Sequence, residues 1–403
     1  MKRHLPSVAL LLFGLLLALA GTTSRAGASS PEQTQIILPD FFGGGPAESD
    51  RDASGGGAPS SLVQLAWFNN PPADGNLEPL THKFGSFILG RQYDEMRDSL
   101  RAEGVKSPFL MYMRFEAIHD PGSCDATPRR NQVADQPGDF CRISAEHPDW
   151  FMLDEAGNRI MVDEGGLHYY MMDPGNPGWR AFWLERARAE LEASSWDGVS
   201  LDNVEASRSA YRKRGAMPAA YPDDASFQAA VQGFLVYMYQ SYFQPRGLRL
   251  QANVTAVADE AVWFNYMQYL DGAMEEGWAV DWHDGYLSPR QWENHVSRVE
   301  QTQTLGKNVI VVSQGAQSDQ NRHDFAFASY LLAASGRASF RYSDASSYRT
   351  VWLYDTYNAD LGQPLGPRYQ VGDEWRRDFA NGSVSVNPVA HTARISVGQL
   401  QQG

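Results

Sequence analysis

Two stretches of the sequence share one pattern: Trp196-Asp197-Gly198-Val199-Ser200-Leu201-Asp202 and Leu270-Asp271-Gly272-Ala273-Met274-Glu275-Glu276. In each, an Asp-Gly pair opens a short apolar run, and a carboxylate follows four residues after the glycine. Such a run is typical of a strand in a parallel sheet. Because side chains alternate along a strand, Asp202 and Glu276 should share one orientation if both strands enter the sheet alike, and Glu275 has the opposite parity.

Further short apolar runs alternate with segments of helical periodicity. The expected strands are Leu62–Phe68, Pro108–Arg114, His168–Met172, Gly198–Asp202, Leu248–Val254, Gly272–Glu276, Asn308–Ser313 and Ala338–Tyr342. The expected helices are Gln92–Glu103, Pro177–Ala193, Ala225–Tyr242, Pro289–Leu305 and Asp324–Ala334. Eight strands alternating with helices over about 280 residues predict an α/β fold, a closed (β/α)8 TIM barrel. An open doubly wound sheet is the alternative, but the Gly-rich dinucleotide fingerprint expected after its first strand is missing.

The start of the chain predicts export to the periplasm or beyond the cell. Lys2 and Arg3 precede an apolar run from Val8 to Ala20, which has the length of a signal peptide and is short for a membrane span. We therefore expect no membrane anchor after signal cleavage. The predicted boundaries are 1–28 for the signal peptide, 29–61 for a linker rich in Gly and Ser, 62–343 for the barrel and 344–403 for a short β-rich tail.

Composition narrows the range of partners. The formal charge of −14 argues against a nucleic-acid partner, because phosphate binding needs clustered Lys and Arg. Eleven Trp, 18 Tyr and 19 Phe form a heavy aromatic load, which serves either core packing or the stacking of sugar rings. The sequence does not indicate an oligomeric state.

The two cysteines, Cys124 and Cys141, lie in one polar stretch. An exported protein meets an oxidising compartment, so we expect a disulfide between them. The alternative is a pair of free surface thiols.

Polar residues follow most of the expected strands, where a barrel carries its functional groups. They are Trp67, Glu116, Asp173, Asp202, Asn253, Glu276, Gln314 and Arg341 or Tyr342. Buried charge at such places is costly without a partner or a task. Glycoside hydrolysis needs at least two facing carboxyl groups, and Asp202 and Glu276 are the candidates. Repulsion between them raises the pKa of one carboxyl group, which then serves as the proton donor. The alternative is that each carboxylate only pairs with a neighbouring Arg or Lys.

Other chemistries lack their motifs. The nine His are scattered without metal-ligand spacing, and the sequence contains no Gly-x-Ser-x-Gly elbow and no phosphate-binding loop. We expect no metal and no organic cofactor in catalysis.

Several motifs resemble those of a known family. They are His147-Pro148-Asp149-Trp150-Phe151, Asp154-Glu155-Ala156-Gly157-Asn158, Asp173 to Asn176, Trp196 to Asn203 and Met274-Glu275-Glu276-Gly277. They are similar to motifs of the hypothetical glycoside hydrolases called "15-related". Those are predicted bacterial (β/α)8 enzymes, distantly similar to melibiase-type and endo-α-1,4-polygalactosaminidase barrels. The resemblance covers most of residues 62 to 390.

The resemblance implies hydrolysis of glycosidic bonds in a poly- or oligosaccharide, with retention of configuration. It implies that Asp202, after strand four, is the nucleophile and that Glu276, after strand six, is the general acid/base. Glu275 stays open as the alternative acid/base. The candidate sugar contacts are Trp67, Asp173, Asn203, Asn253, Glu275, Trp278 and Arg341.

Two other functions compete with this interpretation. One is a non-catalytic polysaccharide-binding barrel in exopolysaccharide assembly, which would not need both carboxylates in one cleft. The other is a deacetylase, lyase or esterase acting on sugar polymers; deacetylation usually needs a metal triad, which is not evident in the sequence. The sequence does not indicate the sugar, its anomer or endo versus exo action.

Overall fold

The computed structural model describes residues 62–213, 215–282, 285–344 and 348–398, so the predicted signal peptide and linker lie outside the described residues. Eight parallel strands close a barrel in the order β1-β11-β10-β9-β8-β7-β3-β2. They are β1 (Leu65–Asn69), β2 (Phe84–Gly90), β3 (Phe109–Arg114), β7 (Gly198–Glu205), β8 (Arg249–Thr255), β9 (Gly272–Glu276), β10 (Asn308–Gln314) and β11 (Ala338–Ser343). The predicted (β/α)8 barrel is confirmed.

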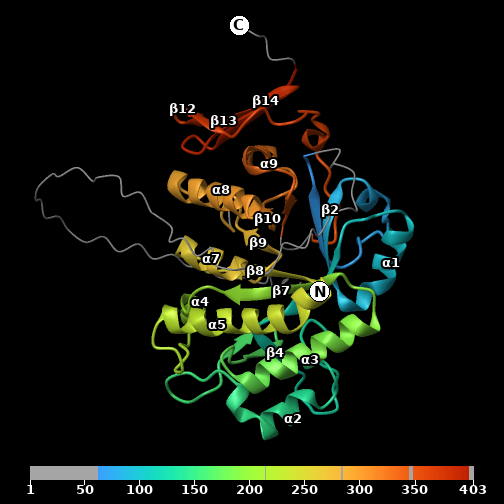
Figure 1. Cartoon of the computed structure of the whole chain (residues 1–403), viewed down its shortest axis with the longest axis vertical. Helices are drawn as coiled ribbons and strands as arrows, with labels where there is room; N and C mark the ends of the chain where they lie inside the picture. Colours follow the sequence, from blue (N-terminus) through green and yellow to red (C-terminus); the bar gives the residue numbers. More distant parts are fainter. Residues whose placement is uncertain (1–61, 214, 283–284, 345–347, 399–403) are drawn as a thin grey trace, which may run out of the picture. The chain divides into compact units, whose positions relative to one another are not determined.

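Helices connect the strands and surround the barrel (Figure 1). The α-helices are α1 (Asp94–Ala102), α2 (Asp139–Glu146), α3 (Pro177–Ala193), α4 (Ser209–Lys213), α5 (Asp224–Met238), α6 (Gln244–Arg246), α7 (Glu260–Met267), α8 (Pro289–Thr304) and α9 (Gln320–Ala333). The short helical turns are η1 (Glu78–Thr81), η2 (Arg91–Tyr93), η3 (Pro148–Trp150), the π-helical η4 (Tyr239–Phe243) and η5 (Asp355–Asn358).

The long helices begin where side chains satisfy their first backbone amides. At α3, Asn176 accepts hydrogen bonds from the amides of Gly178 and Trp179, and Pro177 occupies the first turn. At α8, Ser288 and Gln291 form a capping box ahead of the helix. These caps explain why the sequence pattern placed the start of both helices correctly.

The Asp-Gly pairs hold neighbouring strands in register. Asp197 accepts a hydrogen bond from the amide of Phe109 at the start of β3, and Asp271 accepts one from the amide of Leu250 in β8. Gly198 has φ 155° and lies so close to β8 that a Cβ would stand 2.0 Å from the carbonyl oxygen of Arg249. Only glycine fits there, so the repeated motif has a structural origin.

One predicted strand was wrong and one was missed. His168–Met172 does not enter the barrel: β6 (His168–Met171) pairs antiparallel with β4 (Ala117–Asp120) and β5 (Met161–Asp163) in a small separate sheet. The missing barrel strand is β2. Both segments are short apolar runs, and periodicity does not tell which sheet such a run joins. The two errors cancel in the strand count, because one strand before β7 was added and one was omitted. β7 and β9 are therefore the fourth and sixth barrel strands in chain order, as predicted.

The insertion between β3 and α3 contains the disulfide. Cys124 and Cys141 are bridged, with their Cα atoms 5.7 Å apart, so the predicted pairing is confirmed. The bridge ties the loop after β4 to the first turn of α2.

Breaking this disulfide is expected to loosen the insertion more than the barrel. The closed loop has a sequence separation of 17 residues. The chain-entropy model assigns such a loop about 3 kcal/mol of stabilisation. A variant with both cysteines changed to serine should therefore be cleaved by trypsin within the insertion, where Arg129 and Arg130 are exposed. Equal cleavage rates in parent and variant would contradict this expectation.

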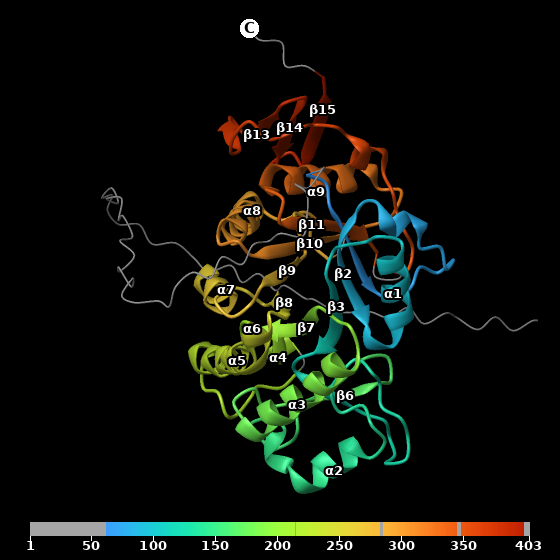
Figure 2. The ribbon, with the colours of Figure 1, turned by 45° about the vertical axis from the view of Figure 1, so that its right-hand side comes forward.

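The tail forms the predicted β-rich element. Strands β12 (Tyr369–Val371), β13 (Glu374–Phe379), β14 (Gly382–Asn387) and β15 (Thr392–Val397) make an antiparallel sheet in chain order. Strands β14 and β15 pack on α9, as Figure 2 shows. The guanidinium of Arg377 in β13 donates hydrogen bonds to the carbonyls of Leu331, Leu332 and Ala334 at the end of α9. Among the described residues, no helix has the length and apolar character needed to cross a membrane.

Candidate active site

A cavity of about 130 Å³ lies at the carboxyl ends of the barrel strands. Both predicted carboxylates, Asp202 and Glu276, contribute to its wall. The lining is Phe68, Asn69, Ile88, Tyr112, Ser200, Leu201, Asp202, Asn253, Met274, Glu276 and Tyr348. The floor belongs to the apolar cluster of the barrel interior, which includes Phe68, Ile88 and Met274. The cavity wall thus combines polar side chains with apolar ones.

The side-chain amide of Asn253 connects the two carboxylates. Its Nδ2 donates to Oδ1 of Asp202 at 3.1 Å and to Oε2 of Glu276 at 3.0 Å. Asn253 is 5% exposed, and its Oδ1 atom has no hydrogen-bond partner among the described residues. The structure therefore brings together three of the predicted site residues, from β7, β8 and β9.

Asp202 is held on both oxygens. Besides the bond from Asn253, its Oδ2 accepts a hydrogen bond of 2.5 Å from the hydroxyl of Tyr112 in β3. Burial and the nearby Asp202 raise the pKa of Tyr112 well above its ordinary value, so this hydroxyl keeps its proton at neutral pH. Two donors from neighbouring strands fix the carboxylate in one orientation.

The environment of Glu276 favours the protonated form of its carboxyl group. Burial, and then repulsion from Asp202 and Glu275, raise its pKa to about 7, although the hydrogen bond from Asn253 acts in the opposite direction. A carboxyl group with such a pKa is partly protonated at neutral pH and can donate a proton. This is the environment that a general acid needs.

A β-bulge shapes the end of β7. The register with β8 shifts between Leu201 and Val204, and Asn203 adopts a left-handed φ of 57°. Bulges near strand ends re-aim side chains. Here Asp202 enters the cavity, whereas the amide of Asn203 donates to Glu116 at 2.9 Å. Asn203 is therefore not part of the cavity wall.

Glu275 lies on the outer face of β9, as its parity predicts. It is 5% exposed, accepts a hydrogen bond from the guanidinium of Arg298 in α8, and lies 3.3 Å from His295. Arg298 also binds Glu260 of α7. The carboxylate of Glu275 thus joins the barrel to two helices and does not line the cavity.

The two tryptophans proposed as sugar contacts are buried outside the cavity. Trp67 packs edge-on against Phe84 with 0% exposure. Trp278 has 0% exposure as well, and its indole donates to the carbonyl of Ala326 in α9. Neither indole ring lines the cavity. Phe68, the neighbour of Trp67 with the opposite parity, faces the cavity instead.

Arg341 and Asp173 also stay outside the cavity wall. The guanidinium of Arg341 donates to the carbonyls of Tyr348 and Thr350, so it positions the segment that carries the Tyr348 ring. Asp173 follows β6, which is no barrel strand; its carboxylate accepts hydrogen bonds from the amide of Gly175 and the hydroxyl of Tyr221. It stabilises the turn before α3.

Sequence reasoning missed three polar residues of the cavity. Tyr112 is the one polar-tipped side chain in the middle of Phe109–Arg114, and strand parity alone could have placed it inside. Asn69 ends β1 with a left-handed φ of 62°, and its buried Oδ1 has no hydrogen-bond partner among the described residues. Tyr348 comes from the segment after β11, for which the sequence offers no signal.

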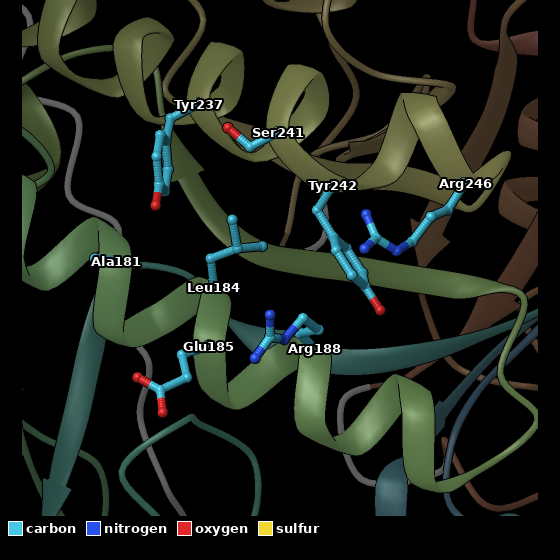
Figure 3. A pocket seen from close by; sticks show the side chains of 8 residues that line it. All are labelled: Ala181, Leu184, Glu185, Arg188, Tyr237, Ser241, Tyr242 and Arg246. Carbon is cyan, nitrogen blue, oxygen red and sulfur yellow. The ribbon is translucent and has the colours of Figure 1, made fainter.

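A larger hollow of about 340 Å³ lies outside the barrel, between α3 and the helical segment from α5 to α6 (Figure 3). Tyr237, Ser241, Tyr242 and Arg246 line one side of it. Its lining contains a single carboxylate, Glu185. Chemistry that needs two facing carboxylates therefore fits the mouth of the barrel and not this hollow.

The family assignment rests on the sequence around these strands. The model of hypothetical glycosyl hydrolase family 15 matches residues 124–383. The chain belongs to this family. The match includes both cavity carboxylates, and the resemblance to the "15-related" barrels is confirmed. Membership of hypothetical glycosyl hydrolase family 15 makes the chain a glycoside hydrolase by family.

Solved structures similar to this member of hypothetical glycosyl hydrolase family 15 include two glycoside hydrolases. The glycoside hydrolase domain of PelA from Pseudomonas aeruginosa has 14% identity and a TM-score of 0.48, covering 72% of this chain and 97% of that chain. The α-galactosidase TtGalA from Thermus thermophilus has 12% identity and a TM-score of 0.45, covering 82% of this chain and 67% of that chain. The comparison with curated proteins found no match.

Proposed function

We propose that this protein is an exported glycosidase that cleaves a poly- or oligosaccharide by a retaining two-carboxylate mechanism. Asp202 is the nucleophile and Glu276 the general acid/base. The observation that carries the proposal is the amide of Asn253, which donates to both carboxylates. Acceptors on the two hydrogens of one amide lie about 5 Å apart. Retaining glycosidases need a carboxyl separation of about 5 to 5.5 Å, whereas inverting ones need about 6.5 to 9.5 Å.

The reaction proceeds in two displacements. In the first, Glu276 gives its proton to the glycosidic oxygen while an oxygen of Asp202 attacks the anomeric carbon, so the leaving group departs as an alcohol and a glycosyl ester forms. The ester has no charge. Its formation removes the repulsion from Asp202 that raises the pKa of Glu276, and Glu276 then acts as a base. It takes a proton from water, which attacks the anomeric carbon and releases Asp202.

Other cavity residues have supporting roles in this proposal. Tyr112 and Asn253 orient the nucleophile through their hydrogen bonds. The unpartnered Oδ1 atoms of Asn69 and Asn253 are acceptors available to sugar hydroxyls. Export is supported by the signal-like start of the sequence and by the disulfide between Cys124 and Cys141.

A substrate screen tests the proposed activity. The purified protein is incubated with a panel of nitrophenyl glycosides and bacterial exopolysaccharides, and the products are sized by mass spectrometry. Proton NMR of the first-formed sugar distinguishes retention from inversion. Binding of a polysaccharide without cleavage would favour the non-catalytic barrel, and release of acetate without chain cleavage would favour a deacetylase.

The rate should fall on the alkaline side of neutral pH. The pKa of Glu276 is raised to about 7, and only the protonated form donates to the leaving group. We therefore expect kcat/KM on a confirmed substrate to decrease tenfold per pH unit above a midpoint of about 7. The Asn253→Ala variant should move this midpoint upward, because the hydrogen bond from Asn253 lowers the pKa of Glu276. A flat profile between pH 6 and 9 would contradict the assignment of the acid.

A further inference from the structure

A second barrel cavity, of about 200 Å³, lies at the amino-terminal ends of the strands, at the other end of the barrel from the carboxylates. Its wall includes Gln64 before β1 and Ser86, Asn308 and Ser339 near the starts of β2, β10 and β11. Ile88 lines both barrel cavities, so an apolar layer separates this cavity from the one above. The proposed catalytic machinery does not extend into it.

The charge at this cavity differs in sign from that of the whole chain. The chain has a formal net charge of −14, yet Arg249 and Arg337 line the cavity, and its lining contains no Asp or Glu. Both arginines are exposed, and neither forms an ion pair within the described part of the chain. Arginines elsewhere are commonly paired, as Arg298 is with Glu275 and Glu260. Two arginines without an ion pair among the described residues therefore line one cavity.

A buried amide donor also belongs to this cavity. Gln251 is 6% exposed, and its buried Nε2 has no hydrogen-bond partner among the described residues. Arg249, Gln251 and Asn253 are spaced by two residues along β8, so their side chains share one face of the strand. Asn253 donates to the two carboxylates of the active-site cavity. The side chain of Gln251 therefore faces the barrel interior. Buried polar groups without partners are uncommon in native structures, which points to a ligand or water that accepts from this amide.

We propose that this cavity binds a small oxyanion, with Arg249 and Arg337 at its rim and the Nε2 group of Gln251 as an inner donor. Guanidinium groups present paired N–H donors that match the oxygens of a carboxylate or a phosphate. The volume of about 200 Å³ suits a small ligand rather than a polymer. The shared chemistry is that of an oxyanion, whose source is either free phosphate or the carboxylate of a uronic acid.

Calorimetric titration at low ionic strength tests the site. Inorganic phosphate and glucuronate are titrated separately into the parent and into three variants, Arg249→Gln, Arg337→Gln and Gln251→Leu. Saturable binding of phosphate alone identifies the free ion as the ligand type, and saturable binding of glucuronate identifies a sugar carboxylate. Each arginine substitution should weaken binding about tenfold, the loss expected for one charge-assisted hydrogen bond. Added NaCl should weaken binding in the parent because it screens both guanidinium groups.

Arg290→Gln is the matched control, because Arg290 is exposed on α8 and does not line the cavity. It should bind both ions as the parent does. The proposal is overturned if the parent binds neither ion saturably, or if Arg249→Gln and Arg337→Gln bind like the parent. Both arginines are exposed, so their variants should fold even if Gln251→Leu does not. The oxyanion site does not depend on glycosidase activity. Repeating the titration with Asp202→Asn therefore tests the oxyanion site separately from the proposed glycosidase function.

Discussion

Asp202→Asn should lower kcat/KM at least about a thousandfold, equivalent to about 4 kcal/mol of transition-state stabilisation. The amide has nearly the shape of the carboxylate, so the hydroxyl of Tyr112 can still donate to an oxygen at this position. The amide cannot displace a leaving group to form a glycosyl ester. The loss should therefore be equal for substrates with good and with poor leaving groups, because both need the same nucleophile. Initial rates on a confirmed substrate measure it.

Two controls make this result specific. The melting temperature of Asp202→Asn should stay near that of the parent, which excludes unfolding as the cause of the loss. Tyr112→Phe should keep the nucleophile but remove the donor to its Oδ2 atom, and a fall of about tenfold is expected for one lost hydrogen bond to a charged group. If Asp202→Asn retains the parent rate, the nucleophile is another group and the non-catalytic barrel becomes the better interpretation.

The sequence predicted the carboxylates because their strands are buried and regular. An Asp-Gly pair marks the start of β7 and of β9, and strand parity then separates Glu276 from Glu275. The structure explains the regularity, since Asp197 and Asp271 each accept a hydrogen bond from the backbone of a neighbouring strand. Local sequence pattern and strand pairing agree at these positions. Counting residues along each strand was therefore sufficient to predict which carboxylates face the barrel interior.

The residues that sequence reasoning placed wrongly or missed depend on long-range packing. Trp67 lies in the middle of β1 with the parity opposite to that of Phe68, and the indole of Trp278, which follows β9, is held by α9, so both rings lie outside the cavity. Tyr348 is held at the cavity by Arg341, which donates to the carbonyls of its segment, and by Gln314, which donates to its hydroxyl. The bulge at the end of β7 directs the side chain of Asn203 to Glu116, away from the cavity that Asp202 lines. None of these contacts has a periodicity that a single sequence displays.

Glu276→Gln should separate the two steps of the reaction. Glutamine cannot give a proton to the leaving oxygen, so hydrolysis of alkyl glycosides should fall at least about a thousandfold, whereas substrates with a dinitrophenolate leaving group need little protonation and should still form the glycosyl ester. The ester then accumulates, because no base activates water. Added azide should restore turnover and yield a glycosyl azide, detectable by mass spectrometry, because azide attacks without losing a proton.

The same variant has a stability signature that does not depend on any substrate. The folded state raises the pKa of Glu276 to about 7, so the native protein loses stability as the pH rises through that value and the buried carboxyl ionises. Glutamine stays neutral. Glu276→Gln should therefore melt at a higher temperature than the parent at pH 8 and at nearly the same temperature at pH 5. Equal melting temperatures at both pH values would show that the carboxyl of Glu276 is not in the buried environment from which its acid role is argued.

Glu275→Gln is the matched control for the acid/base assignment. Its carboxylate pairs with Arg298 on the outer face of β9, and Glu260 would still neutralise part of the guanidinium charge after its removal. The substitution should therefore destabilise the fold by about 2 kcal/mol, the cost of one hydrogen bond between charged groups. The rate per folded molecule should remain close to that of the parent, and azide should have no effect. If Glu275→Gln loses the rate and is rescued by azide while Glu276→Gln is active, the acid/base role moves to Glu275, and the outward orientation of its side chain cannot describe the working enzyme.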